Sequence, residues 1–140
     1  MKKTIILLFS ILTLSSFNEV YETKFNIVGK WKAQENNEIG FIIFDSEGYA
    51  YFEFNGLKIG GKEFIYQGKK GSMRYEVKHK EKLMEIDLIV TVIEEKKTES
   101  MLCIAEKINK DEIKLAIGFE GVRPNSFENN ESMIFKRVKE

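Results

Sequence analysis

Short runs of alternating apolar and polar residues, separated by turn residues, recur along the chain from Gly29 to Val138. In residues 113–119, for example, the large apolar side chains would all share one face of an extended segment. This period of two is typical of β-strands with one buried face. Between the runs, Asn55-Gly56 is a strong hairpin signal, and residues 45–48 (Asp-Ser-Glu-Gly) predict a tight turn. The pattern therefore predicts an all-β domain.

Eight or nine strands are expected, and no amphipathic helix is visible. The expected strands are 29–34, 39–44, 49–54, 57–66, 74–79, 83–93, 99–108, 113–119 and 132–138. The segment 57–66 is the weakest of them, because Gly60 and Gly61 interrupt it. Residues 68–71, which begin and end with glycine, are expected to form another turn.

Short connections favour pairing between consecutive strands. A meander of about eight strands either closes into a barrel or leaves two unpaired edges, and closure removes the aggregation hazard of those edges. A β-sandwich is the alternative, but the short turns leave little length for the crossovers that it needs. We therefore expect an eight-stranded (eight to nine) antiparallel up-and-down meander barrel, which has room inside for side chains or one small ligand.

The first residues have the three-part plan of a secretory signal peptide. Lys2 and Lys3 are followed by an apolar run, residues 5–14, and then by the small residues Ser15 and Ser16. The run is too short for a membrane-spanning helix, which needs about 20 apolar residues. A buried N-terminal strand or helix is the alternative. The expected division is a signal peptide over 1–16 and a barrel domain over 17–140, in a protein that is exported to the periplasm or secreted.

Charge and cysteine content limit the expected partners. The chain has 22 basic and 22 acidic residues, so removal of Lys2 and Lys3 leaves 20 against 22, a net charge of −2. This balance argues against a nucleic-acid partner. Cys103 is the only cysteine and lies far from the leader, so no lipid anchor is expected. No later segment is long and apolar enough to predict a membrane span.

Two sequence features resemble the lipocalins. Gly29-Lys30-Trp31 resembles their Gly-x-Trp signature, in which the tryptophan plugs the closed end of the barrel and an arginine of the last strand packs across its ring. Arg137 is suitably placed for that role, and a guanidinium over an indole is a favourable cation–π arrangement. Residues 123–127 resemble the Arg-Pro-x-x-Phe of bacterial lipocalin-like families, which precedes a basic terminal strand.

The resemblance extends from Ile27 to the C-terminus and implies a calycin-type β-barrel. It also implies structural roles for five residues. These are Gly29, Trp31, Arg123, Pro124 and Arg137. The additional loop motifs of vertebrate lipocalins are not recognisable, so the resemblance concerns the fold more than a carrier role.

The chain shows no catalytic or metal-binding constellation. His79 is the only histidine and lies in a lysine-rich stretch, which favours an exposed strand end over a catalytic triad. Cys103 lies among apolar residues and is interpreted as a small buried hydrophobe. Zinc would need four ligands. The carboxylates lie in turns or at alternate strand positions, which favours outer faces, although a glycosidase-type pair stays open as an alternative. We expect no cofactor and no enzymatic activity.

Aromatic residues are abundant and supply the candidate ligand site. Their simplest role is to fill the barrel core, and the functional alternative is an aromatic-lined pocket. The candidate lining residues are Phe41, Phe52, Phe54, Tyr66 and Tyr75. If Phe52 faces inward, then Tyr49 and Tyr51 face outward and form a contact patch.

Two functions follow from this set of observations. The first is an exported protein that binds a small hydrophobic ligand in the barrel. The alternative is an extracellular or periplasmic module that binds or inhibits a protein partner and whose barrel is filled by side chains.

Overall fold

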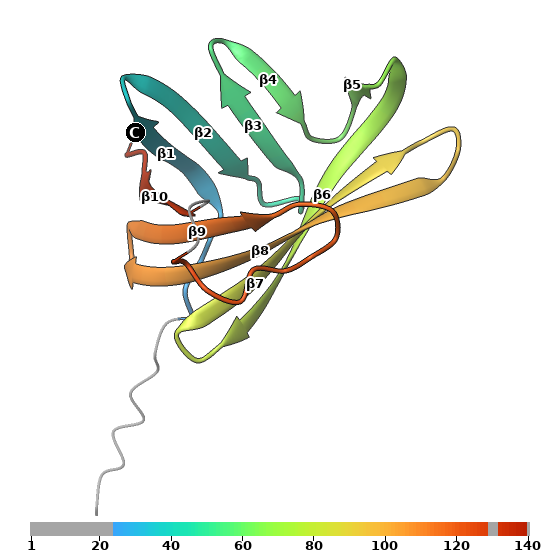
Figure 1. Cartoon of the computed structure of the whole chain (residues 1–140). Coiled ribbons are helices and arrows are strands. Elements are labelled where there is room, and N and C mark those ends of the chain that lie inside the picture. Colours follow the sequence, from blue (N-terminus) through green and yellow to red (C-terminus); the bar gives the residue numbers. More distant parts are fainter. Residues whose placement is uncertain (1–23, 129–131, 140) are drawn as a thin grey trace, which may run out of the picture.

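The computed structural model describes residues 24–128 and 132–139, and the expected signal peptide 1–16 lies outside this part. The described residues form ten antiparallel strands in a single sheet (Figure 1). The strands are β1 (Gly29–Glu35), β2 (Glu38–Phe44), β3 (Ala50–Phe54), β4 (Leu57–Gly60), β5 (Phe64–Tyr66), β6 (Lys69–Lys80), β7 (Leu83–Val92), β8 (Lys97–Asn109), β9 (Glu112–Gly118) and β10 (Ser132–Arg137). The predicted all-β, antiparallel, up-and-down architecture is confirmed.

The sheet curls into a barrel that is nearly closed (Figure 1). Its strand order is β4-β3-β2-β1-β10-β9-β8-β7-β6-β5, so every pair of consecutive strands is hydrogen-bonded except β4 and β5. In addition, the last strand returns beside the first strand, with Trp31 opposite Arg137. β4 and β5 are neighbours in the chain but form the two unpaired ends of the sheet. The opening in the barrel wall therefore lies between β4 and β5.

Backbone hydrogen bonds close the barrel beside this opening. The Met73 N–H donates to the Gly61 carbonyl over 2.8 Å, and the Tyr75 N–H donates to the Gly48 carbonyl over 3.0 Å. Tyr49 and Arg74 form an isolated antiparallel bridge at the same place. These contacts join β6 to the start of β3 and the end of β4. They therefore close the barrel wall at one end of the opening between β4 and β5.

The strand count is higher than the predicted eight or nine, because the expected strand 57–66 is two strands. Gly60 and Gly61 have φ angles of +116° and +84°, which break the extended backbone between β4 and β5. A side chain at Gly60 would collide with the Ala50 carbonyl oxygen. The predicted turn at 68–71 is also wrong in its extent, because the turn ends at Gly68 and Gly71 is a buried residue of β6.

The core lies inside the barrel, where alternate residues of each strand point. In β7 the inward residues Met84, Ile86, Leu88 and Val90 are buried, as the alternation predicts. The largest fully buried side chains are Trp31, Ile42, Phe44, Ile86, Leu88, Cys103, Ile113 and Leu115. Burial of this apolar surface is the main stabilising contribution to the fold.

Residues 119–128 fold back over the outer face of β8 and β9 (Figure 1). Ile104 and Ala116 point outward from the barrel but are buried, at 3 % exposure each. Gly118 leaves room for the loop, because a Cβ there would lie 2.7 Å from the Pro124 ring. A small second apolar cluster therefore lies outside the barrel, and Pro124 belongs to the loop that covers it.

Arg123 fastens this loop to the barrel wall. Its Nη1 donates to the Cys103 carbonyl over 2.8 Å, and its Nη2 donates to the Asp87 carboxylate over 2.6 Å. Its Nε lies 4.0 Å from Glu85. Two adjacent strands, β7 and β8, thus hold one side chain of the loop. Charge-assisted hydrogen bonds of this length are strong, which gives Arg123 a structural role.

Candidate ligand-binding site

One end of the barrel is closed by Trp31. Its indole is fully buried, and its Nε1–H donates to the Ile27 carbonyl over 2.8 Å. The ring of Phe25 packs against it at a centroid distance of 6.0 Å. The guanidinium carbon of Arg137 lies 4.2 Å from the centre of the indole ring, as the resemblance of Gly29-Lys30-Trp31 to the Gly-x-Trp signature implies. Aromatic and aliphatic side chains therefore fill this end of the interior around Trp31.

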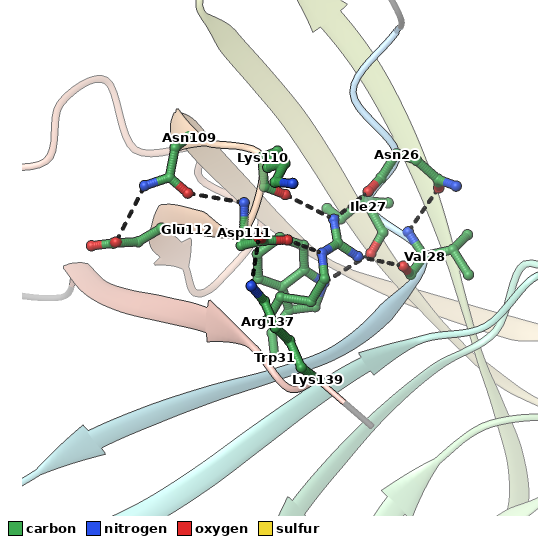
Figure 2. Close-up of polar contacts among 10 residues, drawn as sticks. All are labelled: Asn26, Ile27, Val28, Trp31, Asn109, Lys110, Asp111, Glu112, Arg137 and Lys139. Carbon is green, nitrogen blue, oxygen red and sulfur yellow. Dashed lines mark hydrogen bonds and ion pairs between the residues drawn. The ribbon is translucent and has the colours of Figure 1, made fainter.

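Hydrogen bonds hold the Arg137 guanidinium over the indole (Figure 2). Nη1 donates to the Val28 carbonyl over 2.7 Å, while Nη2 donates to the carbonyls of Asn26 (2.8 Å) and Lys110 (3.1 Å). Nε lies 3.2 Å from the Asp111 carboxylate. The arginine therefore joins the segment before β1 to the β8–β9 turn and covers the closed end.

Gly29 is needed because of this arginine. Its φ angle is +143°, a conformation that side chains disfavour, and a Cβ at this position would lie 2.9 Å from Arg137 Nη1. The Gly-x-Trp pattern thus has a physical reason here, since the glycine leaves space for the cation that covers the tryptophan.

The opposite end of the barrel contains the main hollow, with a volume of about 740 Å³. Typical small-molecule sites have volumes of about 300–1,000 Å³ and mostly apolar walls. The hollow is lined by Phe52, Ile59, Phe64, Tyr66, Met73, Val90, Glu99, Ser100, Met101, Phe119, Glu120 and Gly121. Because Ile59 comes from β4 and Phe64 from β5, the hollow lies at the opening where the sheet does not close.

Polar groups of the main hollow include Tyr66 and Glu99. The Tyr66 hydroxyl donates to Glu99 Oε2 over 3.0 Å, and Gln67 Nε2 donates to the Tyr66 oxygen over 3.4 Å. The hydrogen bond to Glu99 and the negative charge of that carboxylate raise the pKa of Tyr66. Tyr66 is therefore a neutral hydrogen-bond donor at ordinary pH.

A second hollow, of about 410 Å³, lies beside the first and shares Phe52 with it. Its lining residues are Ala33, Glu35, Asn36, Glu38, Gly40, Phe41, Phe52, Glu53, Phe54, Ile117, Met133 and Phe135. Phe52 thus lines two hollows that belong to the same end of the barrel. Movement of one aromatic ring would change the shape of both.

The predicted lining residues divide into two groups. Phe52 and Tyr66 line the main hollow, and Phe41 and Phe54 line the second one together with Phe52. Phe41, however, lies opposite Lys32 and Glu53 on the outward row of β2, and the Lys30 ammonium lies 4.2 Å from its ring centre. It belongs to the rim rather than to the interior wall.

Tyr75 lines neither of these two hollows, which corrects its placement in the predicted site. Its ring packs edge-on against Phe44 at a centroid distance of 4.9 Å, and its hydroxyl donates to the Asp45 carbonyl over 2.7 Å. Desolvation raises the pKa of Tyr75. Tyr75 therefore fills the barrel and holds the β2–β3 turn, because its position on β6 lies toward the filled end.

The sequence prediction missed several lining residues. These are Ile59, Phe64, Met73, Val90, Met101 and Phe119. Alternation was a usable signal for some of them, because Phe119 continues the inward row of β9 and Val90 that of β7. It does not reveal which end of each strand faces the filled part of the barrel and which end faces the hollow.

The two outward tyrosines lie on the outer surface, as expected when Phe52 faces inward. The Lys58 ammonium lies 4.4 Å from the ring centre of Tyr51, whose hydroxyl donates to Asp45 Oδ2 over 3.3 Å. The Arg74 guanidinium lies 5.4 Å from the ring centre of Tyr49. Both rings are thus engaged by neighbours within the protein.

The remaining candidates for chemistry are dispersed. His79 is an exposed residue of β6, and Cys103 is fully buried, where desolvation raises the pKa of its thiol to about 12. Glu85 and Asp87 both lie near Arg123 on the outer face of β7. In residues 24–128 and 132–139, no three His, Cys, Asp or Glu side chains gather as a metal ion would require.

In the same described ranges, no helix is long and apolar enough to cross a membrane. The fold and the hollow together define the molecule as an antiparallel β-barrel with one filled end and one hollow end. Comparison with protein-family models, with curated proteins and with solved structures finds no match.

Proposed function

We propose that this protein is a non-enzymatic binding protein that holds a small, mainly apolar ligand in the main hollow. The observation that carries the proposal is the hollow itself, which has an apolar wall and a volume suited to a small molecule. Each Å² of apolar surface that a ligand buries there contributes about 25 cal/mol. The tyrosine hydroxyl and the carboxylates at its edge are the polar groups that would orient the ligand.

The opening between β4 and β5 gives such a ligand an entry route. Ile59 and Phe119 line the hollow and are also exposed to solvent, at 41 % and 57 %. An apolar rim of this kind is typical of a surface that meets an apolar molecule. Export by the expected signal peptide would place this binding activity in the periplasm or outside the cell.

The alternative of a barrel that is filled by side chains and acts only through its outer surface receives less support. The hollow argues for an occupant inside, and Tyr49 and Tyr51 are engaged by Arg74 and Lys58 rather than free for a partner.

The neutral fluorophore N-phenyl-1-naphthylamine tests the proposal, because its emission rises in apolar surroundings. We expect saturable binding of about one probe per protein with a micromolar dissociation constant, on the order of −8 kcal/mol. Met101→Trp, which adds bulk inside the hollow, should weaken binding about tenfold or more. Ile134→Trp, on the exposed outer face, is the matched control and should leave binding unchanged.

Circular dichroism of both variants checks that the barrel is intact. Absence of probe binding, or equal binding by Met101→Trp and the unsubstituted protein, would refute the proposal. Native mass spectrometry of protein purified from its own host then gives the mass of any natural ligand that stays bound.

A further inference from the structure

The charged residues of the main hollow have one sign only. Glu99 and Glu120 are acidic, and none of the other residues that line the hollow is charged. Glu99 lies on the inward row of β8, opposite Val90 and two positions before Met101, so its strand position directs it to the barrel interior. Glu120 follows the end of β9. Both glutamates are exposed, so their carboxylates lie where this mainly apolar space meets solvent.

The lysines near the hollow form ion pairs with other carboxylates. Lys69 and Lys97 both form ion pairs with Glu95 at the tip of the β7–β8 hairpin, and Lys70 lies 3.4 Å from Glu63. In residues 24–128 and 132–139, neither Glu99 nor Glu120 has an ion-pair partner within 4 Å. Within the described part of the chain, the two carboxylates at the mouth of the hollow thus have no cation in direct contact.

Tyr66 leaves the Glu99 carboxylate able to accept a further donor. It donates one hydrogen bond to Oε2, and no hydrogen bond to Oε1 is formed within the described part of the chain. The raised pKa of Tyr66 keeps the hydroxyl protonated, so it continues to orient the carboxylate at neutral pH. A carboxylate held in this way suits an ammonium group, which has three donors and a positive charge.

We propose that the ligand is a cationic amphiphile, whose apolar body occupies the main hollow and whose ammonium group lies between Glu99 and Glu120. This inference rests on the proposed function, and it names the ligand class. A fatty acid or another anionic amphiphile would bring its head group to the same two carboxylates and would be repelled. The preference is moderate, because both carboxylates are exposed and water screens exposed charges.

Three competitors with the same alkyl chain test the inference: dodecylamine, dodecanol and dodecanoate. Each competitor is titrated against bound N-phenyl-1-naphthylamine at concentrations below micelle formation, and the loss of fluorescence gives its affinity. We expect dodecylamine to bind about threefold to fivefold more tightly than dodecanol, and dodecanoate to bind more weakly than either. The difference should shrink at about 0.5 M salt, where the screening length is only a few ångströms.

Glutamine variants test whether Glu99 and Glu120 cause the preference for dodecylamine. Glu99→Gln should remove most of the preference for dodecylamine over dodecanol, and Glu99→Gln with Glu120→Gln should remove it entirely. Because Glu99 and Glu120 line the hollow, the preference is expressed for each variant as the ratio of its own affinities for dodecylamine and dodecanol. Glu76→Gln removes the same charge from the exposed outward row of β6 and should keep the preference intact.

The outcomes separate the two proposals. If the neutral probe does not bind, the hollow is not a binding site and both proposals fail. If the probe binds but the three competitors are equal, or if the order survives Glu99→Gln with Glu120→Gln, the charge inference fails and the apolar site remains.

Discussion

The guanidinium of Arg137, in the last strand, covers the buried indole of Trp31, in the first strand, at 4.2 Å from the ring centre. The two residues are also direct partners in the register of β1 and β10. This pairing joins the first strand of the barrel to the last one. The two side chains also fill one end of the barrel interior. Because this end is filled, the main hollow lies only at the opposite end of the barrel.

The first prediction concerns the stability that Trp31 provides. Trp31→Ala removes a fully buried indole and its hydrogen bond to Ile27, so the free energy of unfolding should fall by about 3–5 kcal/mol. Urea denaturation followed by circular dichroism measures this change. Ile134→Ala, at an exposed position, should change stability by no more than about 0.5 kcal/mol. A near-neutral Trp31→Ala would show that the indole does not close the barrel.

A second prediction tests the space that Gly29 leaves for Arg137. Gly29→Ala introduces a Cβ at 2.9 Å from Arg137 Nη1, on a backbone with φ of +143°. We expect a loss of about 1–3 kcal/mol in the free energy of unfolding. Gly40→Ala is the control, because its Cβ would meet only Phe54 at an ordinary 3.9 Å. If both substitutions lower the free energy of unfolding equally, Gly29 is not needed to leave space for Arg137.

Much of this architecture follows from the sequence alone. Alternation and turn residues predict most of the strands, and Asn55-Gly56 marks the β3–β4 hairpin. The split of 57–66 was missed, since a double glycine inside an apolar run can be a bulge, a bend or a break. The structure shows a break, because both glycines adopt positive φ angles that end the extended backbone of β4.

The candidate site was predicted less completely, for a different reason. Alternation tells which side chains face inward, but it does not tell how deep each lies along the barrel. Tyr75 and Met73 share the inward row of β6, yet Met73 lines the hollow and Tyr75 packs against Phe44. The register between strands decides this depth, and the register is set by many weak pairings rather than by one motif. The contact of Arg137 with Trp31 was expected because Gly29-Lys30-Trp31 resembles a known signature in which an arginine of the last strand covers the tryptophan.

A third prediction concerns the loop that Arg123 holds. Arg123→Ala removes hydrogen bonds to Cys103 and Asp87, so residues 119–128 should exchange their amide hydrogens faster, and stability should fall by about 1–3 kcal/mol. Hydrogen–deuterium exchange with mass spectrometry measures the loop directly. Arg74→Ala, at an exposed arginine over Tyr49, is the matched control and should leave the loop unchanged. Unchanged exchange in Arg123→Ala would contradict the anchoring role.

The last prediction uses the buried thiol of Cys103. Burial raises the pKa of this thiol to about 12, whereas an unfolded cysteine has a pKa of about 8.5. The native thiol should therefore react with a disulfide reagent such as DTNB only as fast as the protein unfolds.

The same shift gives Cys103 a pH dependence with a definite sign. Above about pH 8.5 the unfolded chain has lost the thiol proton while the native protein still holds it, so the free energy of unfolding falls as pH rises. Between about pH 8 and pH 10.5, the loss attributable to this group should be about 2–3 kcal/mol. Cys103→Ala lacks the titrating group, so its stability should decline less steeply over the same range. Parallel pH profiles of the two proteins, or rapid DTNB reaction of the native thiol, would show that the thiol is accessible to water.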